Sequence, residues 1–182
     1  MHPGDSFSQL TVTAELDEPL RVLKRDLDFL SRALGTAVFR RVWRDALEKL
    51  SSMLWTEVLM SSKFAASGAA QFARDIHAIC ALVERYLPDV GHNALASLVE
   101  GVRLLSLPAS GEEVQGDGGE DGREKEGGGK KEEEEPMTLQ MASDWAFMDG
   151  DHAKKLLETL EIETLSPANA RQILRRRVEN SE

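Results

Sequence analysis

The residues that could carry metal chemistry are the tripeptide Asp149-Gly150-Asp151 and four histidines: His2, His77, His92 and His152. Helical zinc sites usually pair two histidines three or four positions apart, and none of these histidines has another at that spacing. The tripeptide shares the first ligands of a calcium-binding loop, but the later ligands are missing, so we expect a turn there. The sequence therefore predicts no metal site.

Two further groups could act as a nucleophile or bind phosphate. Cys80 lies in an apolar run, and as the single cysteine it excludes an internal disulfide, so we expect a buried packing residue. The run Arg175-Arg176-Arg177 could contact phosphate, although basic residues also complement the dipole at the C-terminal end of a helix. No glycine-rich phosphate loop is present, and the net charge is −10. The sequence predicts no enzyme, no cofactor and no nucleic-acid partner.

The negative charge is concentrated in residues 109–136, which hold 11 acidic and 4 basic residues together with 8 of the 14 glycines. Such a segment buries too little apolar surface to offset the entropy lost on ordering. We expect a disordered acidic insertion, with an acidic interaction tail as the alternative interpretation.

The apolar pattern predicts an all-α fold, a helical bundle without strands. Five leucines form one stripe that ends before Gly35, namely Leu20, Leu23, Leu27, Leu30 and Leu34. Such a stripe fits either bundle packing or a short coiled-coil seam. A second helix is expected from a Thr36 cap to about Ser62. A third should begin near Ser67 or Gly68 and end at Pro88, and a fourth should cover about 93–105.

Order should return at Met137, with two short helices separated by the Asp149 tripeptide. A last helix should begin at Leu165-Ser166-Pro167, with Ser166 as cap and Pro167 in the first position. The expected organisation is a flexible lead-in over residues 1–14, a bundle over 15–108, the acidic linker over 109–136, and C-terminal helices over 137–182 that pack on the same bundle.

A stretch around the second and third helices contains a Leu-Trp pair, a Phe, a Gly-Ala-Ala-Gln block, an apolar residue and an Asp. These are Leu54, Trp55, Phe64, Gly68, Ala69, Ala70, Gln71, Phe72 and Asp75. The stretch resembles the C-terminal helical region of the RINT/TIP family of vesicle-tethering proteins. The end of the chain, from Leu165 to Val178, is similar to the last helix of some members. From the residues alone, we predict that Trp55 and Phe72 anchor the core and that the small residues allow close helix packing.

This resemblance implies a non-enzymatic subunit of a Dsl-type (NRZ) tethering complex, in the C-terminal part of a helical rod. It implies a role in Golgi-to-ER retrograde transport, with tether subunits and ER SNAREs as partners. Members of the family are several times longer, so the chain resembles a fragment or a truncated gene model.

No run of residues is long and apolar enough to span a bilayer. We therefore expect a cytoplasmic protein, peripheral at the endoplasmic reticulum and reaching the membrane only through proteins. The alternative function is a stand-alone helical scaffold or coiled-coil adaptor unrelated to trafficking.

Overall fold

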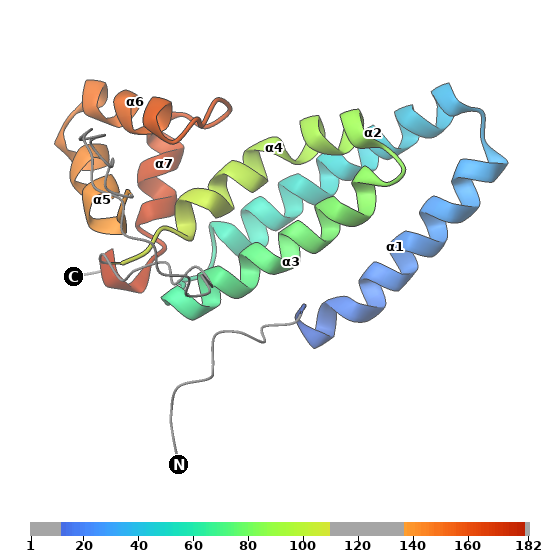
Figure 1. The fold of residues 1–182 in the computed structure, drawn as a ribbon, viewed down its shortest axis with the longest axis horizontal. Helices are drawn as coiled ribbons and strands as arrows, with labels where there is room; N and C mark the ends of the chain where they lie inside the picture. The colour runs from blue at the N-terminus through green and yellow to red at the C-terminus, as the bar shows by residue number, and fades with distance from the viewer. Residues whose placement is uncertain (1–11, 110–136, 181–182) are drawn as a thin grey trace, which may run out of the picture.

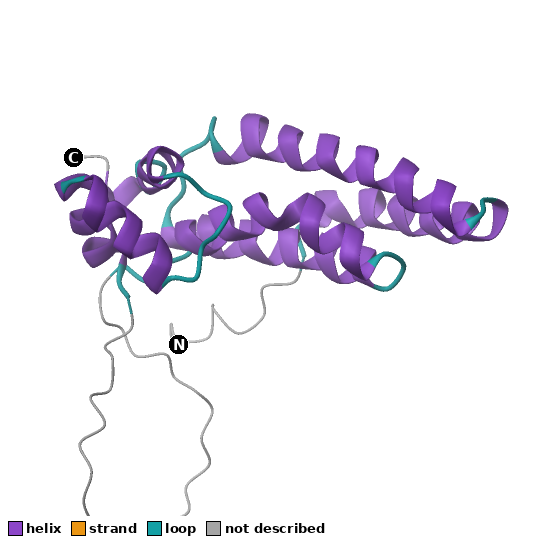
Figure 2. Cartoon of the chain, turned by 90° about the horizontal axis from the view of Figure 1, so that it is seen from above, coloured by secondary structure: helices purple, strands orange, loops and turns teal. Residues whose placement is uncertain are grey.

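The computed structural model describes residues 12–109 and 137–180, and over these residues the protein is all-α, as predicted. Four long helices come first: α1 (Ala14–Ala33), α2 (Thr36–Met53), α3 (Ala66–Glu84) and α4 (Pro88–Leu105). Three short helices follow: α5 (Leu139–Met148), α6 (Gly150–Thr159) and α7 (Pro167–Leu174). The long helices lie side by side, and the short ones gather at one end of the bundle (Figures 1 and 2).

Helix α4 lies between α2 and α3 and packs extensively against both of them. Helix α1 packs on α2 and α3 as well, through smaller contacts. At the other end of α4, helix α7 joins the bundle to the C-terminal helices, and α5 and α6 pack on α7 and on each other. The bundle is therefore tightly packed around α4 and less so around α1.

The leucine stripe of α1 faces the bundle. Leu27 is completely buried, and the other four leucines of the stripe are partly buried against the same core. The stripe is thus occupied by contacts within the chain, which is the bundle-packing interpretation of the sequence. Helix α1 ends at Ala33, close to the expected stop at Gly35.

The predicted second helix is not one regular α-helix. It is α-helical only to Met53, and a six-residue π-helix, Leu54–Leu59, follows it. The hydroxyl of Thr56 donates to the carbonyl of Ser52 at 2.5 Å, and Ser61 bonds the carbonyl of Glu57. These side-chain bonds compete with main-chain amides for the helix carbonyls. Helix propensity alone does not reveal such competition. The family-like Leu-Trp pair opens this π-helix.

Pro88 has the opposite role to the one expected. Helix α3 already ends at Glu84, and Pro88 is the first residue of α4, where a proline needs no amide hydrogen. The connection is tight, because a Cβ added at Gly91 would lie 2.7 Å from Cγ1 of Val83. The fourth helix therefore begins five residues before the predicted Asn93.

The starts of the three short helices follow the expected capping chemistry. Ser166 caps α7, as predicted, by accepting a hydrogen bond from the amide of Asn169 at 3.2 Å. Thr138 caps α5 in the same way. Asp149 caps α6, so the tripeptide that resembled a calcium loop is a helix start.

Part of the expected organisation lies outside the described residues. This applies to most of the lead-in and to residues 110–136 of the acidic linker. The described part of the chain has no helix long and apolar enough to cross a membrane.

Candidate functional site

The connection between the π-helix and α3 is bonded to the C-terminal tail. The amide of Phe64 donates to the carbonyl of Arg176 at 2.7 Å, and the amide of Val178 donates to the carbonyl of Phe64 at 2.9 Å. The Phe64 ring is buried and stacks on Phe72, with ring centroids 5.6 Å apart. We call Phe64, Phe72 and Arg176–Val178 the Phe64 junction.

Arg177 is the most enclosed polar residue of this junction, with only 1% of its surface exposed. One of its nitrogens, Nη1, donates to the carbonyls of Leu105 and Leu107 at 2.7 and 2.9 Å. Nε and Nη2 donate to the carboxylate of Glu179, each at 3.1 Å, and these bonds hold the pKa of Glu179 below its ordinary value. Arg177 therefore stabilises the C-terminal end of α4.

The rest of the arginine run does not form a phosphate site with Arg177. Arg175 is exposed, and its guanidinium lies 5.1 Å from the centre of the Phe147 ring. The carbonyl of Arg175 accepts a bond from Nζ of Lys63 at 2.6 Å. Arg176 is half-buried, and its Nε is buried without a hydrogen-bond partner among the described residues. The three arginines thus face different surroundings, and the interpretation as one phosphate-binding group has no geometric support.

The polar residues of the family-like stretch hold the start of α1. Asp75 accepts from the amide of Thr13 at 2.9 Å and from its hydroxyl at 2.5 Å. Gln71 donates to the Thr13 hydroxyl at 3.1 Å and to Asp75 at 3.2 Å. Gln71, Asp75 and Thr13 form a bridge between α3 and the first turn of α1, which we call the Thr13 bridge.

The small residues of the stretch have different environments. Ala69 is completely buried, and its carbonyl accepts a bond from the Ser106 hydroxyl at 3.4 Å. Gly68 is exposed, and a Cβ added there would meet only the Phe64 ring, at 4.0 Å. Ala70 is half-buried. Close packing therefore depends on Ala69, and the position of Gly68 has room for a side chain.

Leu54 and Trp55 are half-buried and pack against the core from its side. A Cβ added at Gly101 of α4 would lie 3.0 Å from the Trp55 ring and 3.0 Å from Leu59. The glycine allows the π-helix to approach α4 closely. Trp55 and Phe72 therefore support the core from its edge, and the buried aromatic residues are Phe39, Trp43 and Phe64.

Two of the histidines and the cysteine line one groove between α3 and α4, with a volume of about 200 Å³. His77, Cys80 and His92 lie there with Glu84 and Glu100, yet no group of three in the described part of the chain could hold a metal ion. Burial raises the pKa of Cys80 from 9.0 to about 11, with a smaller contribution from Glu84, so the thiol is protonated and unreactive at neutral pH.

Glu100 and Asp149 have structural partners. Glu100 accepts from the amides of Glu163 and Thr164 at 3.1 and 2.9 Å, which fixes the loop before α7. His152 lies 2.8 Å from Asp149, and bonds from its amide and its ring hold the pKa of Asp149 below the ordinary value. No arrangement of acid, base and nucleophile emerges among the described residues.

An open apolar face on α1 and α2 was not expected from the sequence. Its large exposed side chains are Val22, Phe29, Val38, Val42 and Met53. Val38, Val42 and Met53 lie on one side of α2, because their spacing of 4 and 15 positions from Val38 brings them to similar angles around the helix. The buried stripe of α2 runs beside them and consists of Phe39, Trp43 and Leu47. The sequence did signal this face, because the apolar sector of α2 is wide. A sector of that width has more apolar surface than contact with a single neighbouring helix can bury.

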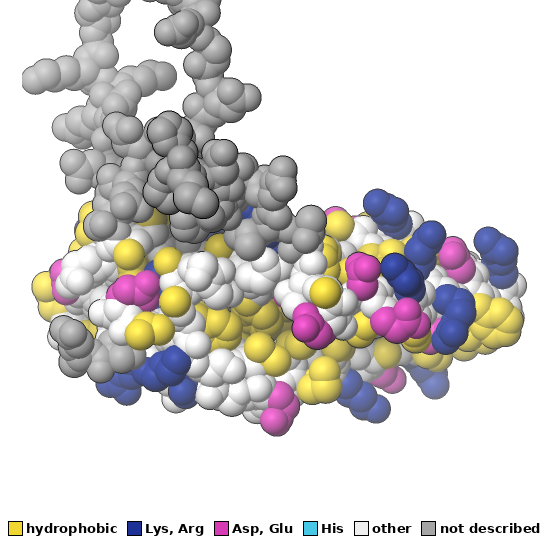
Figure 3. Space-filling model, turned by 90° about the horizontal axis from the view of Figure 1, so that it is seen from below, with side chains coloured by type: hydrophobic (Ala, Val, Ile, Leu, Met, Phe, Trp, Pro, Cys, Tyr) yellow, Lys and Arg dark blue, Asp and Glu magenta, His cyan; other side chains and the backbone are white. Residues whose placement is uncertain are grey.

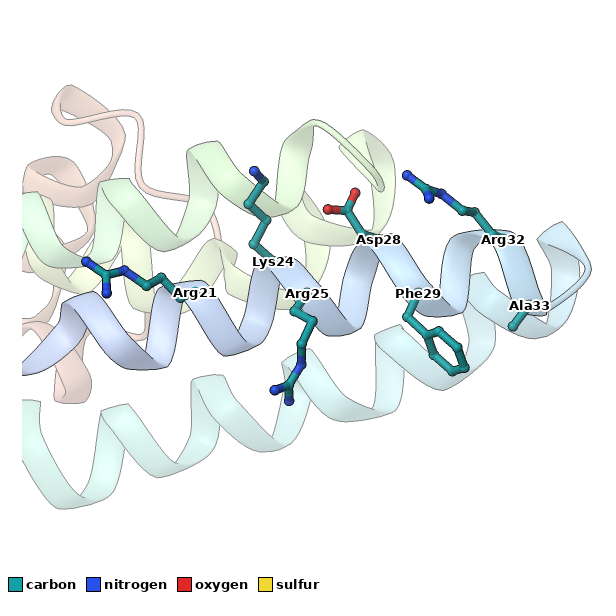
Figure 4. Close-up of a pocket in the computed structure, with 7 residues that line it drawn as sticks. All are labelled: Arg21, Lys24, Arg25, Asp28, Phe29, Arg32 and Ala33. Atoms are coloured by element: carbon teal, nitrogen blue, oxygen red, sulfur yellow. The ribbon is translucent and has the colours of Figure 1, made fainter.

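Figure 3 views the molecule from the side of α1 and shows apolar side chains between charged ones towards the end where α1 and α2 meet. Figure 4 shows Phe29 and Arg25 on the side of α1 that faces α2, whereas Lys24, Asp28 and Arg32 lie on the opposite side. The hydroxyl of Tyr86 donates to Asp28 at 2.6 Å. The two long sides of α1 thus differ in chemistry.

Comparison with known proteins gives one finding. The sequence model of the RINT-1/TIP-1 family matches residues 2–177, nearly the whole chain. Neither a curated protein nor a solved structure matches.

Proposed function

The chain belongs to the RINT-1/TIP-1 family, and on this basis we propose that it is a non-enzymatic part of a complex that tethers Golgi-derived vesicles at the endoplasmic reticulum. The family consists of tethers and scaffolds, not of enzymes. The family match over residues 2–177 is the observation that carries this proposal.

The physical character of the described residues is compatible with such a role. A tether acts by binding other proteins, which requires helical surfaces and needs no reactive groups. Glu100 of the α3–α4 groove and Arg177 of the Phe64 junction are engaged in hydrogen bonds within the chain, and an apolar face on α1 and α2 is exposed. We propose that the nine family-like residues act mainly in packing.

We further propose that the partners are other tether subunits and the cytoplasmic regions of ER SNAREs. On this account the protein is cytoplasmic, peripheral at the endoplasmic reticulum, and reaches the membrane through these proteins. The described part of the chain is close to neutral overall, so anionic lipid alone should attract it little.

The test is a vesicle-binding assay with the purified full chain. Vesicles carrying reconstituted cytoplasmic regions of ER SNAREs should bind it, whereas protein-free anionic liposomes should not pellet with it. Strong binding to bare liposomes would contradict an indirect membrane role. If no ER SNARE binds, the SNARE-contacting part of the proposal is wrong for this chain.

The alternative, a coiled-coil adaptor, would use the leucine stripe of α1 for self-association. All five leucines of that stripe pack against the core of their own chain. This use of the stripe favours the tether over the adaptor. A parallel dimer that dissociates when Leu23 and Leu30 are changed to alanine would reverse that preference.

A further inference from the structure

The open face on α1 and α2 contains a groove. Two open hollows of about 460 and 350 Å³ lie along the helices, and they adjoin at Asp26, which lines both. We treat the two hollows together as one groove. We call it the α1–α2 groove, and its defining residues are Val22, Asp26, Phe29, Val42, Trp43 and Leu50. On α1 it extends from Leu16 to Leu30, about 21 Å at about 1.5 Å per residue.

The lining of the groove is mostly apolar, and its charged side chains are all acidic. Its charged lining residues in the described structure are Glu18 and Asp26, and no lysine or arginine lines it. Among the described residues Asp26 pairs with its neighbour Arg25, at 3.1 Å on the surface, and Glu18 lies 3.9 Å from Arg21. Such exposed pairs contribute little and exchange readily. A cationic side chain of a partner can therefore replace them.

Trp43 forms part of the enclosed wall of the groove. The residue is only 8% exposed, and among the described residues its indole nitrogen Nε1 has no hydrogen-bond acceptor. A buried indole N–H normally has a partner, and this one is closed off from solvent although the groove is open. Trp43 lines the same part of the groove as Phe29, which is 67% exposed.

We propose that the α1–α2 groove binds an amphipathic helix of about four turns from another protein. The apolar side of that helix would face Val22, Phe29 and Val42, and a flanking lysine or arginine would pair with Asp26. The apolar lining, the length and the acidic charge together favour this occupant. The proposal deepens the tethering function by stating the chemistry of a helical partner, and it rests on that function for the partner's cellular identity.

A membrane surface is a weaker candidate for this face. Lipid binding would use the basic side chains of α1 together with Phe29. Two of them are already paired with carboxylates, since Arg21 lies 3.3 Å from Asp17 and Arg25 lies 3.1 Å from Asp26. The acidic lining of the groove also disfavours anionic headgroups.

The probe is a synthetic 15-residue helix with leucines at positions i, i+3, i+4 and i+7 and lysines beside them. Its control is a peptide of the same composition with the leucines spread around the helix. Calorimetric titration of the full chain should give one site, with at least tenfold tighter binding of the patterned peptide. Equal affinity for both peptides would overturn the proposal, because it would reflect attraction to net negative charge.

Variants locate the site. Val42→Asp should weaken binding at least tenfold, whereas Met148→Asp, at an exposed residue of α5 outside the groove, should leave it unchanged. The Asp26→Lys variant should bind the lysine peptide weakly and should instead bind a peptide in which glutamates replace the lysines. Circular dichroism of each variant checks the fold, since Val42 and Met148 are 44% and 63% exposed. Equal losses in the Val42 and Met148 variants would overturn the proposal.

Two other outcomes would assign the groove to a different occupant. Sedimentation could show a dimer of the chain that Val42→Asp converts to a monomer, and the groove would then be a self-association site. Alternatively, binding to protein-free anionic vesicles that Val42→Asp abolishes would make it a lipid site. Either result contradicts the helix proposal. Failure of SNARE vesicles to bind, with the patterned peptide still binding, would contradict only the proposed SNARE contact.

Discussion

The Phe64 junction and the α1–α2 groove differ in how far their central side chains are enclosed by the chain itself. At the junction, Arg177 is buried and its guanidinium bonds two carbonyls and a carboxylate. At the groove, Phe29 and Val42 are exposed, and Trp43 has a buried N–H without an acceptor among the described residues. The Phe64 ring and Arg177 are thus enclosed by their own chain, although Nε of Arg176 has no hydrogen-bond partner among the described residues, whereas the groove leaves large apolar side chains exposed.

This contrast shows that the family-like residues and the open surface are different parts of the molecule. Phe64, Phe72 and Asp75 join helices to one another or to the C-terminal tail. A family-like stretch therefore does not by itself mark the partner surface, because the same residues can serve the packing of the chain.

The largest expected effect is at the junction. Arg177→Met should lower the free energy of unfolding by about 3–5 kcal/mol, because it leaves buried carbonyls and a carboxylate without their donor. Urea unfolding followed by circular dichroism would measure the change. Arg175→Met, at the exposed neighbour, is the control and should cost less than about 1 kcal/mol. Similar losses in both variants would remove the special role of Arg177.

Two glycine substitutions compare a closed position with an open one. Gly101→Ala should destabilise, because its Cβ would lie 3.0 Å from Trp55 and Leu59, and overpacking of about 1–3 kcal/mol exceeds the helical gain of about 1 kcal/mol. Gly68→Ala meets no close atom and should stabilise by about 0.4–1 kcal/mol. Thermal unfolding would show opposite shifts. If both substitutions stabilise, the approach of Trp55 to α4 is not as close as described.

A smaller effect is expected at the Thr13 bridge. Asp75→Ala removes the acceptor for the amide and hydroxyl of Thr13 and should cost about 1–2 kcal/mol. Asp75→Asn keeps one oxygen and should lose less. Hydrogen exchange should show the change mainly in the first turns of α1. A loss spread evenly over all helices would argue that the bridge supports the whole bundle.

The smallest effect concerns thiol reactivity, without any change in fold. Burial raises the pKa of Cys80 from 9.0 to about 11, so its thiolate fraction at pH 8 should be about 100-fold lower than that of a free cysteine. The stability linked to this group is complete below about pH 9 and decreases as the pH rises towards 11. Labelling with a thiol reagent should be slow at Cys80 and fast in Cys80→Ser/Val42→Cys. Comparable rates would show that the α3–α4 groove is as open as the α1 face.

Periodicity predicted the all-α class and the positions of most helices, because the leucine stripe of α1 and the Ser166-Pro167 start of α7 are local signals. The π-helix and the role of Pro88 were not predictable in this way. The first depends on carbonyls shared with Thr56 and Ser61, and the second on the close contact between Gly91 and Val83.

The site was less predictable than the fold. The bond from Thr13 to Asp75 and the pairing of Phe64 with Arg177 join residues 62 and 113 positions apart, and no local pattern marks such contacts. The sequence did contain one usable signal for the groove, the unusually wide apolar sector of α2. It indicated extra apolar surface, but only the arrangement of α1 shows which part stays open.

The contrast between the two regions can be tested by hydrogen exchange of the full chain, read by mass spectrometry without any partner. The account predicts that amides in the middle of α1 exchange through local openings, with a free energy below that of global unfolding, whereas those of residues 69–76 next to the Phe64 junction exchange only on global unfolding. Equal protection of the two segments would contradict the account, because it would show α1 to be held as firmly as the junction.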